Sequence, residues 1–483
     1  MAERQAMGTG AAASTPPWSH RGWVPVQARR SPVEVLASQE SDRLPDLVPV
    51  RHGRMMISPF TFYRGAAAVM AEDLRDTPVA GLSAQLCGDA HLSNFGVFGS
   101  PERRLVFDLN DFDETLPGPF EYDVKRMVTS FVIAARDNGF SPAEAKSLAR
   151  EAAGAYRTAV ADFAGLSTMD VWYASLDEDK LRSAVRGAVD TLSKAEKKAK
   201  SAKEKKLARK RATMAKKGAR RAAKAGEKAH SRDSTQALSK LGEQVGGKYR
   251  IVSQPPVVVP LRELAFEQAP EYTPEQIEQA IREQFDAYRA TLQPDRRHLL
   301  EQFEIVDAAR KVVGVGSVGT RAYIVLLQGK DAGDPLFLQI KEATSSVLEA
   351  HLPRSRYRQH GARVVQGQRL MQAASDIYLG WTRGPRGRHF YWRQLRDMKG
   401  SAEIETMTPV GLAAYARACG WTLARAHARS GDPVAIAAYL GDGDDFDRAV
   451  TDFAVRYADQ NERDYAEFVA AVKAGTLTAA EGI

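Results

Sequence analysis

The sequence has few cysteines and no long hydrophobic segment. Only Cys87 and Cys419 occur among its 483 residues, which excludes a disulfide framework and cysteine-based zinc sites and favours two packed thiols. No apolar run approaches the ~18–20 residues that a membrane span requires. The first residues, MAERQAMGTGAAASTPP, lack the apolar stretch of a signal peptide. We therefore expect a soluble, cytoplasmic protein without membrane insertion.

One segment of the chain contains few acidic residues and is strongly basic. From Lys194 to Arg232 there are 17 Lys or Arg and three Glu, a local charge of +14, and the net charge of +8 leaves −6 elsewhere. The segment has high helix propensity but few large apolar residues. We expect an exposed helical insertion at 193–232. Contact with a polyanion by counterion release is one interpretation, and a solvated helix without a partner is the other.

The length and the change of pattern along the chain predict several packed units of an α+β protein. A chain of 483 residues exceeds the ~250–300 residues of a single core. Residues 1–50 lack sustained periodicity, so we expect a loosely ordered extension with at most a short helix near 33–40. Helical spacing dominates 51–303 and 401–483, whereas strand-like patterns fill 304–400. We therefore expect a β-rich unit between two parts of a large helical unit.

Turn signals locate the strands of this middle region. The runs TRAYIVLLQG and PLFLQIKEA flank the turn-forming GKDAGD, and DIYLGWTRGPRGRHFYWRQL contains GPRG between two β-rich runs. Each pattern predicts a hairpin. In the helical part, Ser141-Pro142 followed by Glu144 predicts a capped helix start.

Acidic and amide side chains gather between 87 and 113, CGDAHLSNFGVFGSPERRLVFDLNDFD. Asp89 and Asn94 stand in a loop after a short predicted strand, and Asp108 and Asp111 lie at the end of the next one. Oxygen ligands at strand ends suit Mg²⁺. The segment lacks the glycine and glutamate spacing of an EF-hand, so calcium is disfavoured, and an ordinary acidic turn is the simpler alternative. His91 is expected to be structural.

A glycine-rich segment precedes a lysine that stands within an apolar strand pattern, where a lysine could also simply extend to solvent from a sheet edge. Gly314, Gly316 and Gly319 have a spacing shared by dinucleotide sites and kinase-type loops. A dinucleotide site would require a helix directly after the glycines, but the β-branched run AYIVLL follows. We therefore predict a glycine flap, including Ser317, whose amides cover nucleotide phosphates, with Lys341 on a neighbouring strand as a point charge.

These motifs resemble those of the protein-kinase-like superfamily. Asp89-x-x-x-x-Asn94 followed by Val-Phe-Asp108 is similar to its catalytic loop and metal-binding aspartate, above all in the aminoglycoside and choline phosphotransferases. The segment 118–126, GPFEYDVKR, resembles the one in which an aspartate, here Asp123, supports the catalytic loop. The resemblance implies that Lys341 is the strand lysine.

The order of the motifs is inverted relative to those enzymes. The segment WTLARAHAR at 421–429 resembles the helix that precedes their catalytic loop, whereas the matching loop stands at Asp89. This order implies a circularly permuted bilobal fold, with a small β-rich lobe mid-chain and a large helical lobe from both ends. Glu349, or alternatively Glu342, is then the ion-pair partner of Lys341. His427 is expected to brace or pack.

The full motif set, SPFTFYRG, GDAHLSNFG, FDLNDFDE, PGPFEYDVKR and YADQNERDY, is similar to the bacterial domain-of-unknown-function family 2252, from about Arg51 to the C-terminus. The resemblance predicts a phosphotransferase that uses ATP and Mg²⁺ on an unidentified hydroxyl acceptor, with Asp89 as base and Asn94 and Asp108 on the metal. Three alternatives stay open: AMP transfer by the same site, a nucleotide-sensing or polyanion-binding pseudokinase, and a dinucleotide-dependent oxidoreductase.

Overall fold

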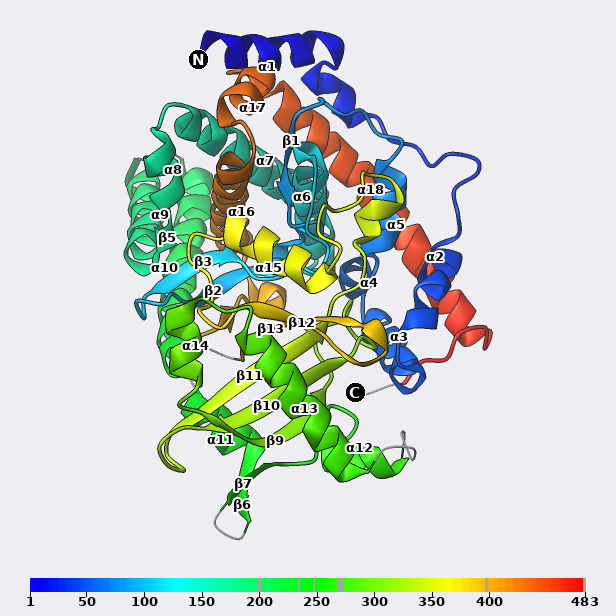
Figure 1. The fold of residues 1–483 in the computed structure, drawn as a ribbon. Helices are drawn as coiled ribbons and strands as arrows, with labels where there is room; N and C mark the ends of the chain where they lie inside the picture. The colour runs from blue at the N-terminus through cyan, green and yellow to red at the C-terminus, as the bar shows by residue number, and fades with distance from the viewer. Residues whose placement is uncertain (199–200, 233, 246–247, 268–272, 396–397, 481–483) are drawn as a thin grey trace.

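Helices form both ends of the chain and an antiparallel sheet forms its middle (Figure 1). The computed structural model describes residues 1–198, 201–232, 234–245, 248–267, 273–395 and 398–480. Helix accounts for 57% and strand for 15%, which confirms the α+β class. Within the part of the chain so described, no helix combines the length and the apolarity needed to cross a membrane.

The main sheet has six strands, all antiparallel, in the order β12-β13-β11-β10-β9-β8. Both predicted hairpins are confirmed, since β10 pairs with β11 and β12 with β13. The strands are β8 (Val258–Pro260), β9 (Glu304–Lys311), β10 (Ala322–Gln328), β11 (Pro335–Glu342), β12 (Gly380–Arg383) and β13 (His389–Gln394).

Strand alternation gives this sheet two different faces. On β11, Leu338 and Ile340 pack with Trp392 of β13 against Tyr288, whose ring stacks on the indole at 4.5 Å between centroids. Tyr288 belongs to α13 (Pro274–Arg289), which therefore covers one face. The opposite face carries Phe337, which packs under α11 (Ser234–Leu241) and the hairpin of β6 (Gly242–Val245) and β7 (Lys248–Ile251). Lys341 lies on this second face, because it is four residues along the strand from Phe337.

Segments from both chain ends build the helical part (Figure 1). The helices α6 (Phe120–Asp137), α7 (Pro142–Ala164), α16 (Pro409–Ser430), α17 (Pro433–Leu440) and α18 (Asp445–Lys473) share one apolar core. The predicted capping box of α7 is confirmed: Ser141 accepts from the Glu144 amide and the Glu144 carboxylate accepts from the Ser141 amide.

Two small sheets pack against the helical part. β1 (Ser83–Leu86) pairs with β4 (Leu116–Pro119). β2 (Phe95–Gly99) and β3 (Leu105–Leu109) lie between β14 (Gly400–Ser401) and β5 (Leu176–Asp177). The acidic segment therefore begins directly after β1, runs through β2 and β3, and ends shortly before β4.

The N-terminal extension is more structured than its sequence predicts. The short helix expected near 33–40 is confirmed as α2 (Pro32–Ser38), but α1 (Ala2–Ser14) was not expected, so the prediction of at most one short helix was wrong. Helix α1 packs so closely on α17 that a Cβ atom added to Gly8 would lie 2.1 Å from the Ala435 carbonyl oxygen. Glycine at this contact allows the two helices to touch, a tertiary feature that local periodicity does not reveal.

The predicted basic insertion is a helical hairpin of α9 (Glu178–Lys198) and α10 (Ala202–His230), the first of which begins before the expected boundary. Residues 199–200 of the insertion are outside the described part. The remaining helices are α3 (Val48–Met55), α4 (Pro59–Gly65), α5 (Ala67–Leu74), α8 (Thr168–Tyr173), α12 (Leu261–Glu267), α14 (Pro294–Leu300) and α15 (His360–Met371).

Candidate active site

The loop after β1 is held by the buried carboxylate of Asp123. Its oxygens accept from the backbone amides of Cys87 at 2.8 Å and Gly88 at 3.0 Å. The His427 Nε2 atom is 3.4 Å from the same carboxylate, and its Nδ1 atom bonds the Tyr156 hydroxyl at 2.8 Å. Asp123 and His427 thus fix the backbone just before Asp89, and both lie where bracing roles require them.

Asp89 lies beside a buried arginine. Arg126 Nε donates to Asp89 Oδ1 at 2.8 Å, and the guanidinium lies 3.7 Å from the Tyr63 ring centroid. Burial alone would lower the pKa of Arg126, but Tyr63 and Asp89 raise it, so the arginine stays charged. Asn94 Nδ2 donates to the Asp89 carbonyl at 2.8 Å. Burial lowers the pKa of nearby His91 to about 3, so its ring is neutral.

Lys341 of β11 contacts the end of the acidic segment. Its Nζ atom is 2.5 Å from Asp113 Oδ2 and 3.8 Å from Asp111 Oδ2. The lysine side chain is 2% exposed, so this ammonium is neutralised inside the protein. Burial lowers its pKa, but the two carboxylates outweigh burial and raise the pKa above its usual value. Two segments more than two hundred residues apart therefore meet at one point.

The Asp113 carboxylate accepts hydrogen bonds from three side chains. Besides Lys341, it accepts from the Tyr391 hydroxyl at 2.7 Å and from the Ser317 hydroxyl at 3.4 Å. Burial would raise the pKa of Asp113, but Lys341, Tyr391 and Arg393 together lower it. Burial and the neighbouring charge of Asp113 raise the pKa of Asp111. Sequence reasoning missed Tyr391, although strand alternation on β13 places it on the sheet face of Lys341.

Asp108 lies in a different environment, which weighs against its predicted role as a metal ligand. Its Oδ1 atom is 2.5 Å from Arg425 Nη2, and its Oδ2 atom accepts from the Ala373 amide at 2.8 Å. Both side chains of the ion pair are 1% exposed. With both oxygens bonded inside the core, Asp108 is a structural anchor between β3 and α16.

Neither glutamate expected beside Lys341 pairs with it. Glu349 lies 3.9 Å from Arg363, and Glu342 pairs with Arg321 at 3.1 Å and Arg388 at 2.8 Å. The glutamate prediction failed because Asp113 already occupies the lysine. Arg363 of α15 instead donates to the Asp113 carbonyl at 2.8 Å and so holds the backbone of that aspartate.

The glycine-rich segment connects β9 to β10, as predicted for a flap. Gly314 and Gly319 have φ angles of 68° and 90°, which only glycine adopts without strain. Arg43 Nη1 donates to the Gly316 carbonyl at 2.9 Å, and the Leu44 amide donates to the Gly319 carbonyl at 2.8 Å. Arg54 similarly bonds the Gly314 carbonyl at 2.7 Å. The extension before α4 thus holds the loop by its carbonyl oxygens, and Ser317 reaches Asp113.

The profile of a family described as uncharacterized proteins conserved in bacteria, DUF2252, matches residues 43–226 and 215–471. The chain belongs to this family. Neither the curated proteins nor the solved structures contain a match to it.

A cavity of about 290 Å³ borders the acidic segment in this DUF2252 protein. Asn110, Arg393 and Lys399 are among its lining residues. Arg393 donates to Gln339 at 2.9 Å and to the Asn110 carbonyl at 3.3 Å. Burial, Arg393 and Lys341 lower the pKa of Lys399 to about 7, while Asp111 opposes this shift. The side of the site next to β13 thus carries the guanidinium of Arg393 and the amine of Lys399.

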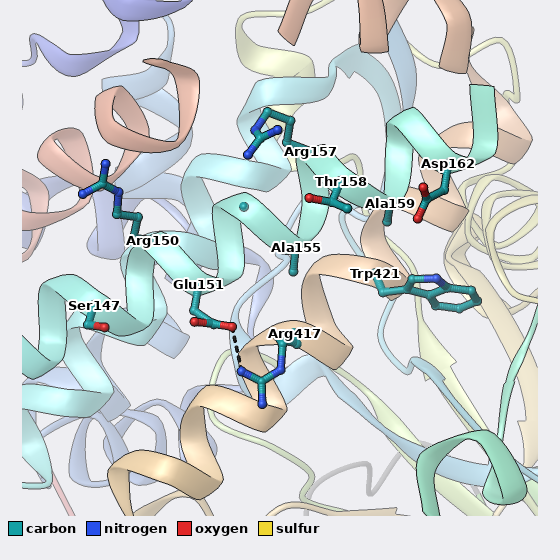
Figure 2. A pocket seen from close by; sticks show the side chains of 11 residues that line it. Ser147, Arg150, Glu151, Ala155, Arg157, Thr158, Ala159, Asp162, Arg417 and Trp421 are labelled. Atoms are coloured by element: carbon teal, nitrogen blue, oxygen red, sulfur yellow. Dashed lines mark hydrogen bonds and ion pairs between the residues drawn. The ribbon is translucent and has the colours of Figure 1, made fainter. Parts of the chain in front are cut away.

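A larger hollow of about 520 Å³ lies between α7 and α16 (Figure 2). None of the predicted site residues lines it. Its arginines are neutralised locally: Arg417 bonds Glu151 at 2.6 Å, and Arg157 bonds Asp447 at 3.0 Å. This hollow is therefore a surface groove between paired charges and not part of the acidic site.

Across the described residues, no three or more His, Cys, Asp and Glu side chains form a group that could hold a metal ion. Asp111 and Asp113 nevertheless provide carboxylate oxygens within reach of one ammonium, and Asn94 follows Asp89 in the adjoining loop. Two carboxylates and an amide oxygen form a hard donor set that suits Mg²⁺ completed by water or phosphate. Asp111 and Asp113 are therefore the carboxylates that could contribute to a magnesium site next to Lys341.

Proposed function

We propose that this member of the DUF2252 family is a kinase-like phosphotransferase that moves a phosphoryl group from Mg·ATP to a hydroxyl acceptor. The observation that carries the proposal is the contact of Lys341 with Asp111 and Asp113. Phosphoryl transfer depends on a cation for the phosphates beside carboxylates for the metal. Here both occur at one point, under a glycine loop that reaches the same aspartate through Ser317.

The order of elements around Lys341 supports a kinase-like small lobe. In protein kinases a glycine-rich loop joins the first strands, the lysine is on the third strand, and helix αC carries its glutamate partner. Here the glycine loop joins β9 and β10, Lys341 is on β11, and α15 follows before β12. One departure is that α15 presents Arg363, which binds the Asp113 backbone, where kinases present a glutamate.

The position of α16 supports circular permutation. In the similar phosphotransferases the corresponding helix leads directly into the catalytic loop. Here the Ser430 hydroxyl, at the end of α16, accepts from the Gln85 amide of β1 at 3.1 Å, although the residues are 345 apart in the chain. The strand that leads into Asp89 therefore starts where α16 ends, which is the spatial continuity that a permuted chain would keep.

Each group has a role in this proposal. Asp89, oriented by Arg126, would take the proton of the acceptor hydroxyl. The acceptor oxygen would then bond to the γ-phosphorus as the bond from that phosphorus to the ADP oxygen breaks. Asn94, Asp111 and Asp113 would hold Mg²⁺, which supplies charge neutralisation of the phosphates when bound. Lys341 would exchange part of its contact with Asp113 for a phosphate oxygen.

The same site suits two related functions. AMP transfer would use the same metal and lysine but would attach adenylate to the acceptor, and a regulatory protein would bind ATP without turnover. Product analysis separates these outcomes.

The test combines binding with product analysis. Mg·ATP should raise the thermal midpoint of the purified protein, and Lys341→Met should abolish this shift while the matched surface variant Lys330→Met retains it. ADP release should fall by about 10²- to 10⁴-fold in Asp89→Asn, the usual effect of losing a general base, with the thermal shift preserved. AMP-modified products would indicate adenylate transfer, and a shift without product would indicate a nucleotide sensor. No shift with Mg·ATP, or a shift that survives Lys341→Met, would overturn the proposed site.

A further inference from the structure

The basic hairpin is built into the fold and is not a loosely attached helix. Ala229, near the end of α10, is 1% exposed and packs with Leu105 and Met398. The Met398 amide donates to the Arg232 carbonyl at 2.7 Å, and Arg232 Nη1 donates to the Lys399 carbonyl at 2.7 Å. The end of α10 is therefore fixed to the chain segment that follows β13.

The side chains of α10 divide into two faces. Small residues at helical spacing point inward, and Ala212, Ala215 and Ala229 are buried. On the opposite face, positions three, four or seven apart carry exposed cations, which form what we call the basic row. At 100° per residue its members lie within a narrow arc. The basic row consists of Lys203, Lys206, Lys210, Lys217, Lys224 and Lys228.

Within α10 itself little negative charge opposes the basic row, and from outside the hairpin Glu144 of α7 interacts electrostatically with Lys210. Helix α10 contains only two acidic residues, Glu204 and Glu227. Glu204 is used at the helix start, where its carboxylate accepts from the Ser201 amide at 3.1 Å. Nothing else in α10 is acidic, so the row extends over most of a helix that is about 43 Å long at 1.5 Å per residue. A partner that carries an extended array of anions would bind favourably to such a rigid line of positive charges.

The composition of the hairpin narrows the class of partner. No Phe, Tyr or Trp occurs from Glu178 to His230, so no aromatic side chain is available to stack on the bases of a single strand. Among the α10 side chains whose exposure the structure describes, no large apolar one is exposed that could insert into a bilayer. Electrostatic attraction is the remaining means of recognition. The phosphates of a double helix provide a regular, rigid and dense array of negative charge for it.

We infer that the basic row of α10 is a binding surface for double-stranded nucleic acid, which it contacts through the phosphate backbone without reading the sequence. RNA and DNA duplexes share this chemistry, and the experiment distinguishes them. No member of the basic row has a role in the proposed phosphotransfer, so this inference does not depend on that proposal.

The test measures fluorescence anisotropy of labelled 20-base-pair RNA and DNA duplexes with the full-length protein in the absence of nucleotide. If about four phosphates are contacted, affinity should fall roughly 100-fold between 50 and 200 mM salt. The variant K206E/K210E/K217E/K224E should bind at least tenfold more weakly. The control R75E/K240E/K330E/K473E changes the net charge equally at exposed positions elsewhere and should stay within twofold of the wild type.

The outcomes are decisive in both directions. Loss of binding in the α10 variant alone supports the inference, and the tighter of the two duplexes identifies the natural backbone. An equal loss of duplex affinity in both variants would show that binding depends on net charge and not on the basic row, and would overturn the inference. Absence of duplex binding, or α10-dependent binding to anionic vesicles instead, would also overturn it. Circular dichroism and thermal midpoints establish that both variants are folded.

Discussion

The acidic site and the basic row contain the same kinds of charged side chain, but they differ in burial. Lys341 is 2% exposed and Asp108 1% exposed, and each bonds a partner of opposite sign from a distant part of the chain. The cations of α10 are exposed and of one sign. A buried charged side chain requires a partner of opposite charge, so it determines which segments pack together. An exposed charged side chain contributes little to folding and is free to bind another molecule. Substitutions in the two regions should therefore have opposite consequences.

The largest expected effect is at the buried pair of Asp108 and Arg425. Burial raises the pKa of Asp108 and lowers that of Arg425, so desolvation opposes both charges even though they attract each other. Arg425→Leu would leave the carboxylate buried without its cation and should lower the free energy of unfolding by about 3–5 kcal/mol. Urea denaturation followed by fluorescence measures the loss.

The double variant Asp108→Leu/Arg425→Leu is the control for this prediction. Removing both charges should be less destabilising than Arg425→Leu alone, because no uncompensated charge remains in the core. If the double variant loses as much stability as the two single variants together, the pair does not behave as a buried unit and the comparison with α10 fails.

An effect of intermediate size on the free energy of unfolding is expected from His20, a buried histidine that stays neutral. Burial, followed by the charge of Lys125, lowers the pKa of His20 from 6.5 to about 3. The unfolded chain therefore binds a proton below pH 6.5 that the folded protein does not bind, so this contribution to stability is full above pH 6.5 and is lost as the pH falls from 6.5 towards 3. At pH 5 the loss should be about 2 kcal/mol.

His20→Gln provides the measurement. Glutamine keeps a polar atom for the Tyr439 hydroxyl, which lies 2.7 Å from His20 Nε2, but it does not titrate. Between pH 7 and pH 5 the wild type should lose about 2 kcal/mol more than the variant in urea denaturation. Equal losses would show that His20 is protonated in the folded protein.

The smallest effect is expected in the basic row. The substitutions K206E/K210E/K217E/K224E exchange exposed residues of similar helix propensity. They should change the free energy of unfolding by less than about 1 kcal/mol in total, since surface positions contribute little. Thermal unfolding at low and high salt measures this. A loss comparable with that of Arg425→Leu would mean that α10 is held by its charges, and the contrast between the two regions would disappear.

The elements that sequence patterns predicted correctly are those decided within about ten residues. The hairpins of β10 with β11 and β12 with β13 follow from alternation and turn residues. The start of α7 follows from Ser141 and Glu144, which bond each other across one turn. The glycine loop between two strands was predictable for the same reason.

Pairings between distant side chains were not predictable in this way. Lys341 was expected to bond a glutamate close behind it in the chain, but its carboxylate is Asp113, on another segment. Asp108 was assigned to the metal because it ends a strand, yet β3 is buried along its whole length. A carboxylate in such a strand needs a cation inside the core, and nothing local to Asp108 indicates that Arg425 supplies it.

The separation of 317 residues between Asp108 and Arg425 has a consequence for biosynthesis. Ribosomes add about 5–20 residues per second, so the aspartate leaves the exit tunnel roughly 15–60 s before its arginine is made. During that interval the nascent β3 strand carries an unpaired carboxylate and stays hydrated. Docking of α16 late in translation is then the step that excludes water from this part of the core.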